Sequence, residues 1–528
     1  MLRVERRYFM KERVLVILEV SQKQAYIFSS NKLKDNIVNS SVIAWIMSGA
    51  YFEETAGNKQ IFSEAKNMVY SGGGHTVLEF ESREKAREFV MLLTKQIHQD
   101  YEGIQVFASI MKYDNKLSPS KNLKNLTAKL EYKKSIRKSA FHQGSYGIEK
   151  IDTNTLEPVR VLETDKQAMP KQEEVQDKAL CPKGFERTFR FEELGGSKND
   201  TNFIAVVHID GNAMGKRVEK FYQTYDHLNW EDFKIKVRKF SASIDKDFKQ
   251  SYLEMADHVA DIVRKNGLEQ LNLSSGKLPI RRIITAGDDI CFVSEGRIGV
   301  ECAALFLKKL SAKINEEDHL PYSACAGVAI VHQKYPFFKA YELSELLCSN
   351  AKKFGASLSS DGTGADVCAI DWHVEFGEVK DTLDDIRKEY RTKDGWNLEL
   401  RPYLVSTTKK IEQEEPFRQY EKFRKLLTRI QKQEINHARG KLKELRGVLK
   451  QGEDATEYFL KFNKIESLKM MCYQDIFVEL QTDRIATGQG LDAKIFVKTK
   501  DEKMRSLLFD TIEMLDTFLP LEDKGGRP

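Results

Sequence analysis

The feature that most constrains the fold is an order of predicted elements that occurs twice. The first copy begins with the apolar run Val14–Val20 and the second with the run Phe203–Asn212. In each copy, apolar periodicity predicts strand, helix, strand, turn, strand, helix, strand, helix. The turn and its flanking strands lie at Asn67–Phe80 in the first copy and at Arg281–Val293 in the second. This order is typical of a ferredoxin-like split βαβ sheet, so we predict an α+β chain with two such sheets.

Length and periodicity together predict the domain organisation. A chain of 528 residues is long enough for three or four domains of roughly 100–200 residues each. The region between the copies is polar and aperiodic, and beyond Asp371 the pattern becomes mostly helical, interrupted by the polar stretch Thr482–Lys494. The predicted units are a first domain at 1–145, a linker or small insertion at 146–200, a second domain at 201–375 and a helical C-terminal domain at 376–528.

Composition excludes several classes of protein. Apolar residues make up 41% of the chain and charged residues 31%, which excludes a disordered chain and a small disulfide scaffold. The sequence has no run of 18 apolar residues and no signal-like apolar segment near Met1, so neither a membrane span nor a secretory signal is expected. The seven cysteines form no C-x-x-C pair, which argues against a thiolate zinc site and favours a reducing cytoplasm.

Charge alone does not identify a partner. The net charge of +5 is too balanced to indicate a nucleic-acid binder. The segment Thr408–Lys450, however, has 13 basic and 6 acidic residues. It is either a solvated helical face or a surface that contacts phosphates, and the sequence leaves both interpretations open.

Three carboxylates are the candidate catalytic residues. Asp210 ends an apolar strand, and Asp288 and Asp289 occupy the turn between two apolar strands of the same copy. In a split βαβ sheet the end of the first strand and this hairpin tip meet at one edge. Three carboxylates gathered there would repel one another without a cation, which predicts one or two Mg²⁺ or Mn²⁺ ions held by all three.

Both aspartates of the turn face one site only if the backbone rotates between them, because successive strand residues point to opposite faces. Gly287 precedes them and accepts a positive φ. The alternative is a plain Asp-rich β-turn, since Asp and Gly favour turns in any case.

Small and basic residues near the carboxylates are candidate contacts for a triphosphate. Backbone N–H groups at a tight turn before a helix approach phosphates closely, and lysines neutralise them. The lysines are equally consistent with ordinary surface residues. The pair Lys352–Lys353, at the end of a helix, would then complement the helix dipole. The predicted contacts in this copy are Gly211, Asn212, Gly215, Lys216, Gly287 and Lys352.

The first copy differs at the corresponding places. Its turn reads Gly72-Gly73-Gly74-His75, and its first strand ends Val20-Ser21-Gln22 where the other ends Ile209-Asp210-Gly211. No metal site of the same kind is therefore predicted there. The glycines expose backbone donors that suit a nucleotide, or they simply form a tight hairpin. His75 is interpreted as a turn or surface residue.

Together these motifs resemble the polymerase/cyclase-like large subunit of type III CRISPR effector complexes. The resemblance rests on Tyr70-Ser-Gly-Gly-Gly74, on Asp210-Gly with Gly287-Asp-Asp289, and more loosely on Gln24-Ala-Tyr-Ile-Phe28 and Gly327-Val-Ala-Ile330. It covers about residues 13–375. The family implies two palm domains, one degenerate and one catalytic with a GGDD-like turn, and ATP bound between them. It also implies metals at the second palm and the synthesis of cyclic oligoadenylate messengers for antiviral defence.

By position, Asp288 and Asp289 match the family's catalytic pair, and Asp210 matches its upstream acidic strand end. Ser71, Gly72, Gly73 and Gly74 match its first nucleotide turn. Ala286 stands where the family usually has glycine, which matters only if that position needs a positive φ. The sequence has no N-terminal His-Asp nuclease motif and no cysteine-pair zinc element, so DNA cleavage by that nuclease is not expected.

Three functional hypotheses remain open. The leading one is a metal-dependent nucleotidyltransferase that joins ATP into cyclic oligoadenylates and releases pyrophosphate. The second is a silent scaffold that binds guide RNA and partner subunits of a CRISPR-type ribonucleoprotein. The third is a two-substrate cyclase on the same palm, which differs from the first only in its product. A stand-alone protein, a complex subunit and a homo-oligomer are all consistent with the sequence, and no membrane partner is expected.

Overall fold

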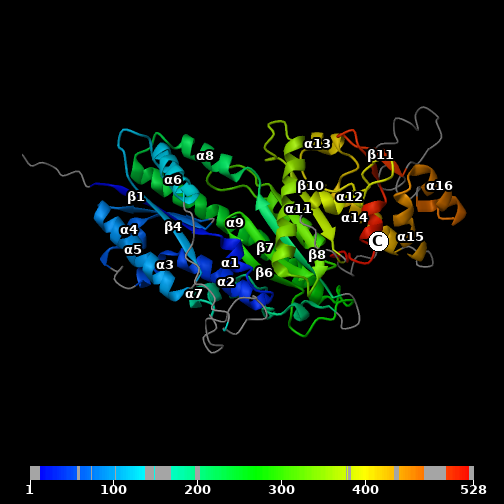
Figure 1. The fold of residues 1–528 in the computed structure, drawn as a ribbon, viewed down its shortest axis with the longest axis horizontal. Helices are drawn as coiled ribbons and strands as arrows, with labels where there is room; N and C mark the ends of the chain where they lie inside the picture. Colours follow the sequence, from blue (N-terminus) through cyan, green and yellow to red (C-terminus); the bar gives the residue numbers. More distant parts are fainter. Residues whose placement is uncertain are drawn as a thin grey trace, which may run out of the picture.

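The computed structural model describes residues 12–55, 60–72, 74–101, 103–136, 148, 168–196, 202–375, 377, 382–432, 439–468 and 495–522. One sheet has four strands, and Figure 1 shows it with its helices at one end of the molecule, in blue and cyan. A larger sheet lies in the middle, and C-terminal helices in orange lie at the other end. The long helix α9 (Trp230–Arg264) runs between the two sheets.

The first sheet has four antiparallel strands in the order β2-β3-β1-β4. The strands are β1 (Val14–Ser21), β2 (Met68–Gly72), β3 (His75–Phe80) and β4 (Gln105–Lys112). Since β1 is apolar on both faces, it is buried in the centre of the sheet. The helices of this half are α1 (Lys23–Ile27), α2 (Leu33–Ile46), α3 (Gly49–Glu54), α4 (Glu64–Asn67), α5 (Arg83–Asp100) and α6 (Pro119–Ile136).

The second sheet has six strands in the order β10-β9-β8-β5-β7-β6. The strands are β5 (Phe203–Gly211), β6 (Ile280–Ala286), β7 (Asp289–Glu295), β8 (Ala324–His332), β9 (Cys368–Val374) and β10 (Tyr403–Ser406). Its strands β6-β7-β5-β8, which form one side of the sheet, repeat the order β2-β3-β1-β4 of the first sheet. β9 adds parallel to β8 and β10 adds antiparallel to β9, so the sheet is mixed. The other helices of this half are α8 (Met214–Thr224), α10 (Gly299–Ser311) and α11 (Phe337–Leu358).

The two halves pack through exchanged helices. Helix α9, which follows β5, packs on β2 of the first sheet, and α2, which follows β1, packs on β6 of the second. The start of α9 is fixed to the first sheet by the Trp230 indole N–H, which donates to Glu79 Oε2 at 2.9 Å. Further along α9, Phe248 and Tyr252 lie in the core of the second sheet. One helix therefore sets the distance between the two sheets.

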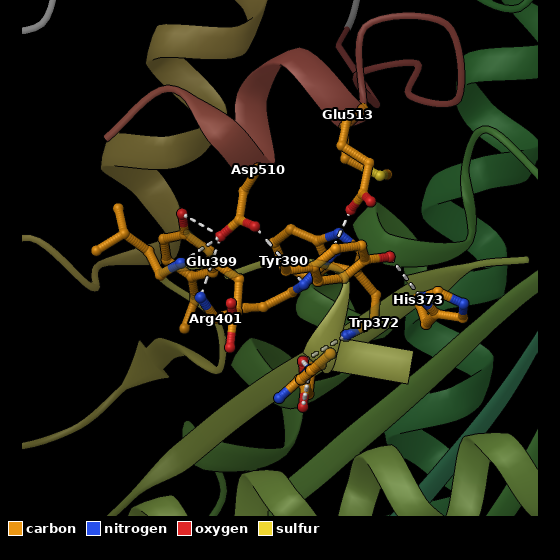
Figure 2. A network of polar contacts seen from close by, with 12 residues as sticks. Trp372, His373, Tyr390, Glu399, Arg401, Asp510 and Glu513 are labelled. Atoms are coloured by element: carbon orange, nitrogen blue, oxygen red, sulfur yellow. Dashed lines mark hydrogen bonds and ion pairs between the residues drawn. The ribbon is translucent and has the colours of Figure 1, made fainter. Parts of the chain in front are cut away.

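A buried ion network attaches the C-terminal segment to the second sheet (Figure 2). The guanidinium of Arg401 is fully buried and lies 2.5 Å from Glu513 Oε2. It also stacks on Trp372 of β9, with 5.4 Å between its central carbon and the ring centroid. Asp510 accepts hydrogen bonds from the Leu400 and Arg401 backbone N–H groups and from the Tyr403 hydroxyl, at 2.9–3.0 Å. The ion pair, the ring stacking and these hydrogen bonds together join the segment to β9 and β10.

The periodicity of the C-terminal segment predicts a helical domain, but the structure shows strands there as well. Strand β10 belongs to the large sheet, and β11 and β12 pair with each other. The predicted polar stretch Thr482–Lys494 lies outside the described residues. The elements here are α12 (Leu383–Lys388), α13 (Lys409–Glu414), α14 (Tyr420–Lys432), α15 (Arg439–Leu449), α16 (Glu453–Phe462), β11 (Phe496–Lys498), β12 (Met504–Ser506) and α19 (Phe509–Glu513).

The region between the halves contributes packed structure as well as linker. It contains α7 (Lys171–Ala179) and a 3₁₀ turn at Phe191–Leu194. Asp177 of α7 accepts from the two terminal guanidinium nitrogens of Arg281 at 2.7 and 2.8 Å, and from Arg282 at 2.9 Å. These charge-assisted bonds fix α7 to β6. Within the described residues, no helix combines the length and apolarity needed to cross a membrane.

Candidate functional site

The hairpin between β6 and β7 closes with a two-residue turn. Ala286 pairs with Asp289 across the ladder, which leaves Gly287 and Asp288 as the loop. Gly287 has a φ of 65°, whereas Ala286 is not among the residues with positive φ. Glycine at the first loop position is the requirement of a type II′ turn, whose twist matches the flanking strands. The turn therefore uses the conformation predicted for Gly287 and places no strain on Ala286.

The structure brings the three candidate carboxylates to one edge of the second sheet. Asp210 is the ladder partner of Asp289, so their side chains lie on the same face of neighbouring strands. Asp288 lies against Gly211, where an added Cβ would be 3.0 Å from Asp288 Cβ and 3.1 Å from its Oδ2. The absence of a side chain at Gly211 thus makes the room that Asp288 occupies.

The electrostatics of this edge are unfavourable for negative charge. Burial, together with the charge of Asp210, raises the pKa of Asp289 to about 7 and that of Asp288 to about 6. Asp289 Oδ1 is buried and has no hydrogen-bond partner. Its nearby imidazole, His208 Nδ1, is 3.6 Å away, and burial lowers the pKa of His208. The cluster therefore has more negative charge than its neighbours neutralise.

One ammonium group contacts the cluster directly. Lys352, on the α11 helix, places Nζ 2.5 Å from Asp210 Oδ2 and 2.8 Å from the carbonyl oxygen of Gly211. The sequence predicted Lys352 as a phosphate contact. In the structure its charge is directed at the end of β5.

The donor chemistry of this edge fits a divalent cation. The carboxylates of Asp210, Asp288 and Asp289 are hard oxygen ligands of the kind that Mg²⁺ and Mn²⁺ prefer, and the unpartnered Asp289 Oδ1 is a free ligand atom. In the part of the chain that the structure describes, however, no group of three or more His, Cys, Asp or Glu side chains is arranged so that it could hold a metal ion. The fit is therefore one of ligand type and charge.

A cavity of about 970 Å³ lies between the two halves and reaches this edge. Asp288 and Asp289 line it from the second hairpin, and Tyr70, Ser71 and Gly72 line it from the first. Because residues of both hairpins share its wall, a ligand in this cavity would contact both halves of the chain.

The first hairpin presents mainly backbone to the cavity. The Ser71 hydroxyl is already bonded, 3.2 Å from the Met47 carbonyl oxygen and 2.9 Å from Thr76 Oγ1. A Cβ added to Gly72 would lie 2.9 Å from the hydroxyl oxygen of Ser241. Gly74 has a φ of 79° and lies beside the amine of Lys23. Gly73 lies outside the described residues.

The residues after Asp210 do not reach the cavity. Asn212 is buried and donates to the carbonyl oxygens of Gly364 at 3.2 Å and Val367 at 2.7 Å, so its side chain anchors the loop before β9. Gly215 and Lys216 are exposed in the first turn of α8. None of the three is part of the cavity wall. The predicted phosphate contacts at these positions are not brought together with the carboxylates.

Sequence reasoning missed a fourth carboxylate near the site. Glu345 on α11 accepts from the Tyr341 hydroxyl at 2.9 Å, and burial raises the pKa of Glu345. It lies seven residues before Lys352, on the same face of the helix. That spacing was available in the sequence. The cavity also includes Lys23 and the α7 residue Glu173, for which the sequence offered no signal.

The ladders also show which residues of the two halves correspond. Glu19 pairs with His75 in the first sheet as Asp210 pairs with Asp289 in the second. The counterpart of Asp210 is therefore Glu19, and the predicted alignment of Ser21 with Asp210 is wrong by two positions. One position of the error arises because β1 continues two residues past Glu19 whereas β5 continues one past Asp210, and the other because Asp210 was taken as the strand end in place of Gly211.

Comparison with known proteins gives a similarity in fold. No family model and no curated protein matches this chain. The Csm1–Csm4 cassette in complex with cA3 matches with a TM-score of 0.53 and 15% identity, over 96% of this chain and 70% of that chain. The Csm1–Csm4 subcomplex of the type III-A CRISPR–Csm interference complex matches with a TM-score of 0.52, at the same identity and coverage. The chain thus has an α+β fold with mixed sheets that resembles Csm1.

Proposed function

We propose that this chain is a metal-dependent nucleotidyltransferase that joins ATP into cyclic oligoadenylates and releases pyrophosphate. The observation that carries the proposal is the group Asp210, Asp288 and Asp289, whose charge is under-compensated and of which Asp288 and Asp289 line a cavity shared by the two hairpins. Sites with pKa values raised by like charges and burial are frequent in enzymes. The fold supports the choice of reaction, since similar structures hold cA3, cA4 and AMPPNP.

The proposed domain division follows the two sheets. Residues 1–145 and 201–375 are two palm domains, 146–200 connects them, and 376–528 form a largely helical C-terminal domain. The first palm is the non-catalytic one, because Glu19 and His75 stand in the ladder where the second has two aspartates.

In the proposed mechanism each group has a defined task. Asp210, Asp288 and Asp289 would hold Mg²⁺ or Mn²⁺, which supplies activation of the attacking ribose hydroxyl and neutralisation of the leaving pyrophosphate. Gly287 orients the two turn carboxylates through its positive φ. Ser71 to Gly74 contact the second nucleotide through backbone groups. Catalysis is then mainly positioning and charge neutralisation.

The test is product analysis of the purified chain with ATP and Mn²⁺ or Mg²⁺, with and without added RNA. Mass spectrometry should detect cyclic oligoadenylates from the wild type. Asp288→Asn/Asp289→Asn, which keeps the side-chain shape and removes the charge, should abolish them. Glu19→Gln, the matched change in the first sheet, should retain them. Equal product from the aspartate variant would overturn the assignment.

A second candidate function is a scaffold that binds RNA and partner subunits. It is favoured by the exposed lysines of α14 and α15, which are Lys425, Lys432, Lys441 and Lys443, the last three paired with Glu522, Glu444 and Asp516. The similar structures pair Csm1 with Csm4, and we extend a partner subunit of that kind to this chain. RNA binding that weakens steeply with salt, without nucleotide turnover, would favour this function over synthesis.

A further inference from the structure

The Lys352 ammonium lies between two oxygens at the end of β5. It is 2.5 Å from Asp210 Oδ2 and 2.8 Å from the Gly211 carbonyl oxygen. A carboxylate and a backbone carbonyl are both oxygen ligands that Mg²⁺ and Mn²⁺ accept. The lysine side chain is 30% exposed, so water and ions can reach the pair. The ammonium therefore occupies a place that suits a divalent cation in both ligand type and charge.

The first half of the molecule contains the same pair. Lys134 Nζ lies 3.0 Å from Oε1 of Glu19, the ladder counterpart of Asp210. Each lysine is on the helix that follows the fourth strand of its half, fifteen residues beyond the first residue of that helix. The acid–lysine pair thus belongs to the repeated unit itself. In the first half it exists beside a hairpin that has no aspartates.

The two pairs differ in what surrounds them. In the first half, Lys134 also binds Glu131 at 3.0 Å, and His75 is the ladder partner of Glu19. In the second half, Asp288 and Asp289 add two carboxylates beside Asp210. The charges of Lys352 and of Lys23, which also acts on Asp289, together remain smaller than those of three carboxylates. The surplus charge creates the demand for a cation that the first half lacks.

We propose that Lys352 is a resident counter-ion of the carboxylate cluster, which a divalent cation displaces from Asp210 and Gly211 when it binds. The proposal rests on the proposed function, since it takes the cluster to be the metal site. It assigns Lys352 a role in metal occupancy: the lysine stabilises the site before the metal enters and competes with the metal for the same oxygens. Lys352 is a positioning residue in this scheme.

The test measures Mn²⁺ binding to the full chain without nucleotide, by calorimetry or by the electron paramagnetic resonance of free Mn²⁺. Lys352→Met removes the charge and keeps the length of the side chain. We expect this substitution to tighten Mn²⁺ binding about threefold to tenfold. This range is the effect expected when a partly exposed ion pair and its positive charge are removed. Lys134→Met, the matched change in the first half, should leave the Mn²⁺ affinity within about twofold of the wild type.

Thermal stability provides a second measurement of the same competition between Lys352 and the metal. In EDTA, Lys352→Met should melt at a lower temperature than the wild type, because Asp210 loses the ammonium that is bonded to it. Added Mn²⁺ should then raise its melting temperature by more than it raises that of the wild type.

The outcomes separate the two proposals. Unchanged or weaker Mn²⁺ binding in Lys352→Met overturns the counter-ion role while leaving the metal site standing. Equal tightening in Lys134→Met also overturns it, because the effect would then be one of overall charge. If the wild type and both variants fail to bind Mn²⁺ while remaining folded, the proposed function fails, and the role of Lys352 fails with it.

Discussion

The two halves of this molecule share their architecture and differ at the tips of their hairpins. Both have the same order of four strands, a two-residue hairpin turn, and a helix that packs on the other half. In the first half the ladder pair at the tip is Glu19 with His75, and in the second it is Asp210 with Asp289. The first half therefore shows that this arrangement of strands forms without aspartates at the hairpin tip. The aspartates of the second half add burial of charge and repulsion that the first half avoids.

The largest contrast is expected in catalysis. Asp289→Asn should reduce product formation from ATP by at least about a hundredfold, because Asp289 Oδ1 is the unpartnered ligand atom of the cluster. Glu19→Gln should reduce it less than about threefold, since the Glu19 carboxylate is bonded to Lys134. Initial rates by chromatography give both values. Similar losses in the two variants would contradict the division of labour between the halves.

The second contrast concerns how closely a helix approaches its sheet. A Cβ added to Gly327 of β8 would overlap the Ser344 carbonyl oxygen and the Cys348 nitrogen of α11. Its counterpart in β4 is Ser109, which keeps a side chain beneath α6. Gly327→Ala should lower the free energy of unfolding by about 3 kcal/mol or more, measured in urea.

The control for that change is Gly447→Ala in α15, where nothing lies within 4 Å of the added Cβ. It should be stabilising by up to about 1 kcal/mol, because alanine has the higher helix propensity. If Gly327→Ala behaved like Gly447→Ala, α11 would not approach β8 as closely as described, and the position of Lys352 on α11 would be in question.

The parts of the fold that depend on local periodicity were predictable from the sequence. The repeated order of elements, both hairpins and the positive φ of Gly287 follow from apolar alternation and turn chemistry. The parts that depend on tertiary pairing were not. Strands β9 and β10 were missed for different reasons: β9 is buried at every position between β8 and β10 and so lacks a half-exposed alternation, and β10, at the edge of the sheet, has only four residues.

The features of the candidate site also divide into those that the sequence predicted and those that depend on tertiary pairing. The meeting of Asp210 with the Asp288–Asp289 turn followed from topology, whereas the correspondence of Glu19 with Asp210 needed the register of the ladders. Lys352 was identified as basic and near the site, but the sequence could not show which group it contacts. A long side chain on a helix reaches either a phosphate or a carboxylate, and only the packing of α11 on β8 decides between them.

The third contrast is in pH dependence of stability, measured in EDTA. A carboxyl whose pKa is raised on folding, like Asp289 at about 7, holds its proton more strongly in the folded state. Its contribution to stability therefore falls as the pH rises from about 4 towards 7 and stays low above that range. Asp289→Asn should raise the melting temperature at pH 8 by more than at pH 5. Glu19→Gln should lower it at pH 8, because it removes the partner of Lys134. The same sign for both variants at pH 8 would contradict the contrast.

The smallest contrast is between two buried serines, one in each sheet. Ser109 of β4 is fully buried and its hydroxyl has no hydrogen-bond partner, whereas the Ser294 hydroxyl of β7 donates to the Glu295 carbonyl oxygen at 2.9 Å. Removing an unpartnered buried hydroxyl relieves its desolvation, so Ser109→Ala should raise the free energy of unfolding by up to about 1 kcal/mol. Ser294→Ala should lower it by about 1 kcal/mol, because it loses a bond. Urea denaturation resolves the opposite signs. A destabilising Ser109→Ala would mean that this hydroxyl has a hydrogen-bond partner in the space between β4 and α6.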